Sequence, residues 1–140
     1  MEVDGNVIGE ISRGYCALLA VEVGDAHADV VWLARKIANL RLFPDEEGRT
    51  NLDLAAVDGA ILLVSQFTLA GECSKGNRPS FVRAAAPDLA EELYEAFAEE
   101  LRQTHGLQVQ TGRFAASMQV HIVNDGPFTV LLETPRSNVP

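Results

Sequence analysis

Hydrophobic residues form two long runs that predict strands covered on both faces. Residues 15–23 read YCALLAVEV, and residues 60–69 begin with the run AILLV. Runs of this length with few polar interruptions are typical of buried strands. Residues 6–12 alternate imperfectly, after an Asp4-Gly5 pair that favours a hairpin turn. Shorter strands are predicted at residues 41–43, 107–109, 118–123 and 128–132.

Two other stretches repeat their apolar residues at helical spacing. Between Val30 and Leu40 this spacing predicts a helix that starts at Asp25, a suitable N-cap, and ends near residue 39. Between Leu89 and Leu101 an apolar residue recurs at every fourth position. That repeat predicts a second helix over residues 88–104.

These elements place the chain in the α+β class, as one domain over residues 1–140. The two helices are too far apart in sequence to cross over every strand, which disfavours a doubly wound parallel sheet. We therefore expect a mostly antiparallel or mixed sheet with the two helices packed against it. No internal repeat or flexible linker divides the chain.

Charge and composition exclude several functional classes. The net charge is −9, from 11 Lys and Arg against 20 Asp and Glu, which argues against a broad basic face that coats nucleic acid. No apolar run reaches the ~20 residues that span a bilayer, and the N-terminus has no secretory pattern. The two cysteines follow no metal-ligand spacing, so we expect no metal, no cofactor and a cytoplasmic protein with reduced thiols.

Two hydroxyl groups and an amide directly follow the second apolar run, in the sequence Ser65-Gln66-Phe67-Thr68. The Thr68 hydroxyl could act as a nucleophile, but no histidine is paired with it by spacing. Alternatively, these residues only satisfy backbone groups at a strand end. A third possibility is that unpaired backbone N–H groups at this strand end stabilise an oxyanion.

Two further motifs could contact a ligand. Lys75 and Arg78 flank a glycine-containing turn that suits a phosphate contact, and Arg83 lies a few residues beyond. Residue types alone favour a trans turn at Gly126-Pro127, because X-Pro bonds are cis in only ~5–6% of folded cases. A rigid loop that presents backbone carbonyls to a ligand is the alternative.

Together these motifs resemble the D-aminoacyl-tRNA deacylase family of bacteria and eukaryotes. The family pattern Ser-Gln-x-Thr-Leu-x-Gly, followed by Lys-Gly-x-Arg-Pro-Ser-Phe, matches residues 65–81. The second family pattern, Asn-x-Gly-Pro-x-Thr, matches residues 124–129. The resemblance extends over residues 3–132, including Met118 and Arg113 in shorter matching stretches.

The resemblance implies a homodimer with a barrel-like antiparallel β core, helices outside it, and an active site at the dimer interface. It implies that backbone N–H groups of Phe67 and Thr68 stabilise the oxyanion while a D-aminoacyl-tRNA ester is hydrolysed. A cis Gly126-Pro127 bond would enter the partner's pocket and exclude L side chains, and a ribose 2′-hydroxyl would assist. The expected substrate contacts are Ser65, Gln66, Gly126, Pro127 and Met118, and the tRNA-phosphate candidates are Lys75, Arg78, Arg83 and Arg113.

This sequence departs from the family pattern in three places. The family usually begins with one more strand, of the type Gln-Arg-Val-x-x-Ala-x-Val, which is expected to join the sheet and support the Gly-Pro loop. Its absence indicates either a fragment or a misassigned start. Ala115 replaces a glycine and Phe128 replaces a valine. Two rival hypotheses remain, a non-catalytic dimeric module that binds the tRNA end and a hydrolase with Thr68 as its nucleophile.

Overall fold

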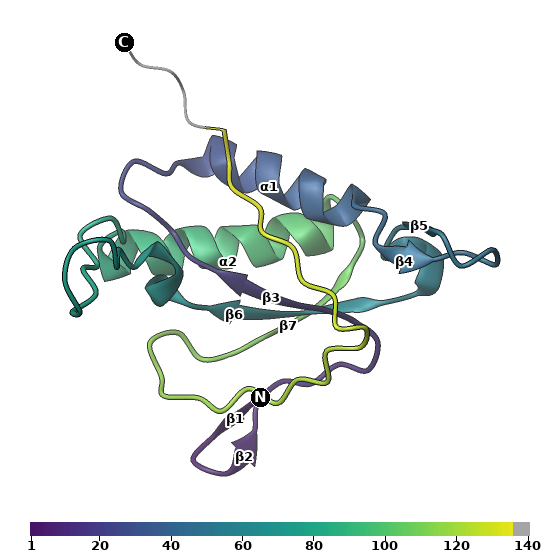
Figure 1. Cartoon of the computed structure of the whole chain (residues 1–140), viewed down its shortest axis with the longest axis horizontal. Helices are drawn as coiled ribbons and strands as arrows, with labels where there is room; N and C mark the ends of the chain where they lie inside the picture. The colour runs from purple at the N-terminus through teal and green to yellow at the C-terminus, as the bar shows by residue number, and fades with distance from the viewer. Residues whose placement is uncertain (136–140) are drawn as a thin grey trace.

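The computed structural model describes residues 1–135, which are arranged in layers (Figure 1). Helices α1 (His27–Asn39) and α2 (Pro87–Gln103) cover one face of a three-stranded sheet. An N-terminal hairpin and residues 118–120 of the segment after the last strand lie on the other face. This is an α+β fold, and none of its described helices is long and apolar enough to cross a membrane.

The central sheet contains β3 (Gly14–Leu19), β6 (Ala60–Ser65) and β7 (Gln108–Thr111), in the order β3-β6-β7. Both strand pairs are parallel, so the prediction of a mostly antiparallel or mixed sheet is wrong for this sheet. Three parallel strands need only two crossover connections, and each helix supplies one. The central sheet has only three strands, because several segments with the composition of strands lie outside it.

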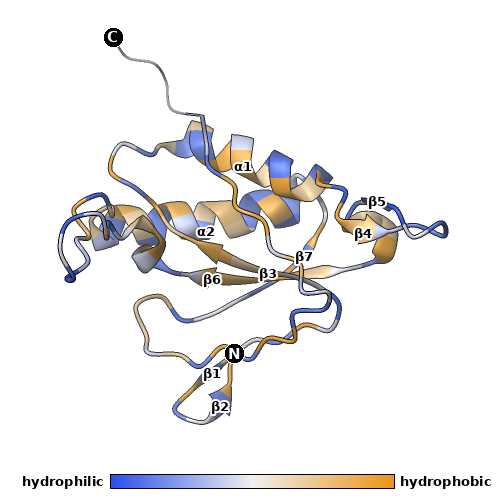
Figure 2. Cartoon of the chain, viewed as in Figure 1, coloured by the Kyte–Doolittle hydropathy of each residue, from blue (hydrophilic) through white to orange (hydrophobic). Residues whose placement is uncertain are grey.

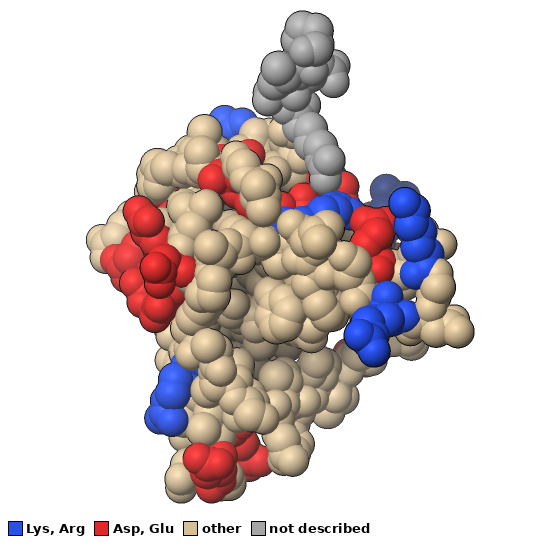
Figure 3. Space-filling view, turned by 90° about the vertical axis from the view of Figure 1, so that its left-hand side faces the viewer, with Lys and Arg blue, Asp and Glu red and all other residues tan. Residues whose placement is uncertain are grey.

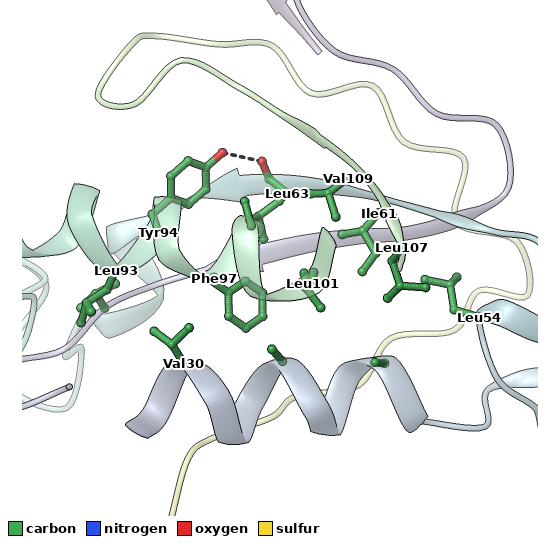
Figure 4. Close-up of a cluster of buried hydrophobic side chains, with 14 residues drawn as sticks. Val30, Leu54, Ile61, Leu63, Leu93, Tyr94, Phe97, Leu101, Leu107 and Val109 are labelled. Carbon is green, nitrogen blue, oxygen red and sulfur yellow. Dashed lines mark hydrogen bonds between the residues drawn. The ribbon is translucent and has the colours of Figure 1, made fainter. Parts of the chain in front are cut away.

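Strand β6 is buried on both faces, as its apolar run predicts. Ile61 and Leu63 face the helices, while Leu62 and Val64 join Met1 in a second cluster beneath the sheet. Alternation of side chains along a strand explains this division. Figure 4 shows the larger cluster between the sheet and the helices.

Both predicted helices form, with starts that differ slightly from the prediction. The Asp25 carboxylate accepts a hydrogen bond from the Glu22 N–H at 2.8 Å, so it closes the preceding turn. Ala26 is the N-cap residue, and the Asp29 carboxylate accepts its N–H at 2.8 Å. Helix α2 begins at Pro87, whose missing N–H needs no partner in a first turn.

Short elements complete the fold. Strands β1 (Glu2–Val3) and β2 (Asn6–Val7) form the predicted hairpin, and both turn residues, Asp4 and Gly5, have positive φ angles of 49° and 79°. These angles suit the tight turns that join antiparallel strands. The remaining elements are the antiparallel strands β4 (Phe43–Pro44) and β5 (Thr50–Leu52), and the 3-10 helices η1 (Ala55–Val57) and η2 (Phe67–Ala70).

The C-terminal segment differs most from the prediction. Residues 118–123 and 128–132 form no strand, and Gln119 makes only an isolated antiparallel bridge with Glu2. Because these residues do not extend the sheet, the described residues form no closed barrel. In the view of Figures 1 and 2 the end of this segment passes in front of the sheet and α1, and its hydrophobic residues Val123 and Leu131 are largely exposed.

Candidate functional site

The end of β6 brings the Ser-Gln-Phe-Thr motif to the surface. Pairing with β7 stops at Leu63, whereas pairing with β3 continues to Ser65. The Gln66 N–H then donates to the Leu19 carbonyl at 2.7 Å, and the chain turns into η2 instead of extending the predicted strand to residue 69. The motif therefore occupies a strand end that is exposed on its β7 side.

Two backbone donors are unpaired at this strand end. Among the described residues, no acceptor is bonded to the N–H of Phe67 or Thr68. The Thr68 hydroxyl accepts a hydrogen bond from the Gln66 side-chain amide at 3.0 Å. An amide N–H cannot take a proton from a hydroxyl, so this contact does not activate Thr68 as a nucleophile.

A loop over residues 71–82 packs beside these donors. The Phe67 side chain is 55% exposed, and its ring meets the Phe81 ring edge-on with centroids 5.2 Å apart. Glu72 and Ser80 close the loop through two backbone hydrogen bonds of 2.7 and 2.9 Å. Lys75 and Arg78 lie on the exposed part of this loop, and neither has an ion pair within residues 1–135. Both cations are thus available for an anion.

Arg83 is in a different situation from the other cations near the motif. Its guanidinium forms ion pairs with Glu72, at 3.1 Å, and with Glu22. The hydrogen bond to Glu72, and then the charge of Glu22, raise the pKa of Arg83 above its ordinary value. Two carboxylates already satisfy this cation, which makes it a weaker phosphate candidate than Lys75 or Arg78.

The second motif forms an exposed loop. The Gly126–Pro127 peptide bond is cis, as the family resemblance implies and contrary to what residue types alone favour. Asn124 braces the loop, because its side-chain oxygen accepts the Phe128 N–H at 2.8 Å and its amide donates to the Thr129 hydroxyl at 2.9 Å. The loop therefore has a defined shape without support from the core.

Figure 3 shows the end of the molecule that bears the loop over residues 71–82, where basic and acidic side chains lie beside one another at several places. Met118 lies under β6, packed on the cluster of Met1, Leu62 and Val64. Arg113 is exposed and has no side-chain partner among the described residues. The net charge of −9 therefore coexists with individual free cations.

The comparisons with known proteins decide the family. A family model described as D-Tyr-tRNA(Tyr) deacylase matches residues 1–133. The chain belongs to this deacylase family. It is 55% identical to the D-aminoacyl-tRNA deacylase of Geobacter metallireducens, across 96% of this chain and 89% of the relative. Identity to the Thermotoga petrophila protein of the same name is 48%, with the same coverage of both chains.

Solved structures support the same fold. A structure described as c-Myc DNA Unwinding Element Binding Protein is 43% identical, with a TM-score of 0.89 over 96% of this chain and 91% of that one. A second structure, described as a probable eukaryotic D-amino acid tRNA deacylase, has a TM-score of 0.62 at 16% identity, over 71% of this chain and 74% of that one. The second likeness concerns the fold alone.

The two deacylase motifs are not joined within one chain. Among residues 1–135, no hydrogen bond, ion pair or ring contact links residues 124–129 to residues 65–68. Two cavities, of about 320 and 240 Å³, are lined by other residues, among them Tyr94 and Phe114 in the first and Trp32 and Lys36 in the second. Neither cavity includes a residue of the two motifs.

Sequence reasoning missed the residues that hold the motifs in place. Glu22 and Glu72 bind Arg83 from distant parts of the chain, and no local pattern marks them as partners. The Tyr94 hydroxyl donates to the Leu63 carbonyl at 2.8 Å (Figure 4). The same hydroxyl accepts the Gly112 N–H at 3.3 Å. A buried tyrosine on a helix stripe gives no sign in the sequence that its hydroxyl supports the strand before the motif.

The departure at Ala115 has a structural meaning. This residue has a φ angle of 62°, in the left-handed region that favours glycine. The glycine that the resemblance leads us to expect at this position would suit this backbone conformation. This chain keeps that conformation with an alanine.

Proposed function

We propose that this protein hydrolyses the ester bond of D-aminoacyl-tRNA and releases the free D-amino acid and tRNA. The observation that carries the proposal is the extent of the family match, which covers 96% of this chain at 55% identity to a D-aminoacyl-tRNA deacylase. The unpaired donors at the end of β6 and the braced Gly126-Pro127 loop supply groups suited to this reaction.

The proposed chemistry uses the main chain. Water adds to the ester carbonyl, and the backbone N–H groups of Phe67 and Thr68 donate to the oxyanion that forms. The tetrahedral intermediate then collapses, the bond to the ribose 3′ oxygen breaks, and that oxygen takes a proton. The neighbouring ribose 2′-hydroxyl assists. Donors placed in advance at a developing oxyanion are worth about 10²–10³ in rate.

We propose that the partner subunit of a homodimer completes the site. Among residues 1–135 no hydrogen bond, ion pair or ring contact joins the two motifs, and the C-terminal segment exposes a set of large apolar side chains. Such surfaces usually mark interaction sites. The set consists of Ile122, Val123, Phe128, Val130 and Leu131. In the dimer, the Gly126-Pro127 loop of one subunit would enter the Ser65 to Thr68 pocket of the other.

The handedness of the substrate is then read by rigid backbone atoms. The loop would hold the substrate α-amino group and leave no room for an L side chain, while Ser65, Gln66 and Met118 would line the pocket. Exclusion of a side chain cannot reject glycine, which has none. We therefore propose that glycyl-tRNA is also hydrolysed, and protection of glycyl-tRNA equal to that of L-alanyl-tRNA would contradict this proposal.

Few phosphate contacts are needed for a substrate gripped at its acceptor end. Lys75, Arg78 and Arg113 are exposed and have no side-chain partner within residues 1–135, so they are the proposed contacts. Each phosphate contact contributes about one unit to the slope of log affinity against log salt. The expected slope is therefore shallow, at most about three units, and a steeper slope would contradict a local grip.

The decisive test compares hydrolysis of D-tyrosyl-tRNA and L-tyrosyl-tRNA by the purified protein. We expect rapid release of D-tyrosine and little release of L-tyrosine. Binding of the D-substrate without turnover would instead favour a non-catalytic module that binds the tRNA end. A molar-mass measurement in solution tests the dimer separately, because a monomer with full activity would refute the shared site.

A further inference from the structure

Arg83 joins two segments that lie far apart in the sequence. Its side chain bonds Glu22, just after β3, and Glu72, at the base of the loop over residues 71–82. The Val23 N–H donates to the Arg83 carbonyl at 2.9 Å, so the backbone of Arg83 is anchored to the same segment as its side chain. The ion pair with Glu72 therefore connects an anchored residue to the loop.

The loop in turn packs against the residues that carry the proposed oxyanion donors. The Phe81 ring lies edge-on against the Phe67 ring. The chain is tightly packed at Gly71, which lies between Thr68 and Phe81. A Cβ there would lie 2.9 Å from the Thr68 carbonyl oxygen and 3.0 Å from a Phe81 ring carbon. Because there is so little space, a movement of the loop would also displace residues 67 and 68.

We propose that Arg83 is a positioning residue, which ties Glu72 to Glu22 and thereby holds the loop, Phe81 and the Phe67 backbone in the geometry for catalysis. This inference rests on the proposed deacylase function. It also removes Arg83 from the proposed tRNA-phosphate contacts, because its guanidinium is already engaged by both carboxylates.

An ordinary surface ion pair is the competing explanation. Exposed pairs contribute little to stability and little to function. Arg83 differs from such pairs because one cation bridges two carboxylates, and its Nε atom is buried with no hydrogen-bond partner among residues 1–135. Within the chain, Arg49 and Glu47 provide an ordinary pair for comparison, at 3.4 Å with side chains 78% and 71% exposed.

The test uses Arg83→Met, which keeps the length of the side chain and removes its charge, with Arg49→Met as the matched control. For Arg83→Met we expect kcat to fall about tenfold with KM within about twofold, because donors are displaced but not lost. Arg83→Lys should recover part of kcat, since it restores the charge but not both bonds. Arg49→Met should match the wild type.

Amide hydrogen exchange of residues 66–71 gives a second readout that needs no substrate. We expect faster exchange in Arg83→Met and an intermediate rate in Glu72→Gln. The second variant keeps the shape of the side chain, and it replaces Arg83→Met in the test if Arg83→Met does not fold. Unchanged kcat and unchanged exchange would overturn the proposal. A raised KM with unchanged kcat and a shallower salt slope would also overturn it, in favour of a phosphate contact. If the wild type shows no deacylation, the proposed function fails, and the exchange measurement still tests whether Arg83 positions residues 66–71.

Discussion

Replacing Gly126 by alanine tests whether a backbone loop sets the handedness of the substrate. Gly126 has a φ angle of 127°, which L residues rarely adopt, and an added Cβ would lie 3.1 Å from the Phe128 nitrogen. Holding a non-glycine residue in such a conformation costs about 1–3 kcal/mol. The loop is exposed and braced mainly by Asn124, so it should relieve this strain by moving while the core stays folded.

The strain sets the expected loss of selectivity. With a tenfold change for every 1.4 kcal/mol, about 1–3 kcal/mol reduces the fraction of loops in the native geometry by about 5- to 150-fold. We expect the ratio of D-tyrosyl-tRNA to L-tyrosyl-tRNA hydrolysis to fall by a factor in this range. Single-turnover rates on both substrates measure the ratio, and urea unfolding measures the stability.

Gly48→Ala is the matched control, because Gly48 also has a positive φ angle, 78°, in an exposed turn where an added Cβ meets no atom within 4 Å. Gly48→Ala should lower the free energy of unfolding by an amount comparable to that of Gly126→Ala, without a loss of selectivity. If Gly126→Ala retains the wild-type ratio while remaining folded, the loop is only a turn and the reasoning is refuted. An equal loss of selectivity in Gly48→Ala would show that the effect is not local.

Further predictions concern single residues. Thr68→Ala should keep deacylation within about tenfold of the wild type, because no base activates the hydroxyl, whereas a loss of about 10³ would restore Thr68 as the nucleophile. Ala115→Gly should raise the free energy of unfolding by up to about 1 kcal/mol in urea titrations, because it relieves a φ angle of 62°. Tyr94→Phe should lower the free energy of unfolding by about 1–3 kcal/mol, since it leaves the Leu63 carbonyl without its donor. Tyr15→Phe should leave it nearly unchanged, because the buried Tyr15 hydroxyl has no partner among the described residues. Equal losses of stability in the two variants would contradict this prediction. Burial raises the pKa of both tyrosines above the ordinary value of 10.0, so the unfolded chain releases these protons first and stability should be lost as pH rises above about 10. Unfolding at pH 8 to 11 should show this loss, reduced in Tyr15→Phe, and a flat profile would contradict the assignment.

Local patterns in the sequence correctly predicted several elements. The run at residues 60–64 predicted a strand buried on both faces, and Ile61 and Leu62 do face opposite clusters. Both helices form where apolar residues recur at helical spacing, and Asp4-Gly5 makes the expected turn. These features depend on side-chain periodicity and local backbone preference, which neighbouring residues determine.

The order of the strands and the surroundings of the site depended on the tertiary structure. Residues 118–123 and 128–132 have the composition of strands, but they find no partner in the sheet of the described chain. Arg83 was expected to bind phosphate until the fold placed it beside Glu22, 61 residues away. The motif residues Ser65 to Thr68 were evident from the sequence, whereas their supports were not. Strand pairing and ion pairing join residues that are distant in the chain, so only the folded arrangement decides them.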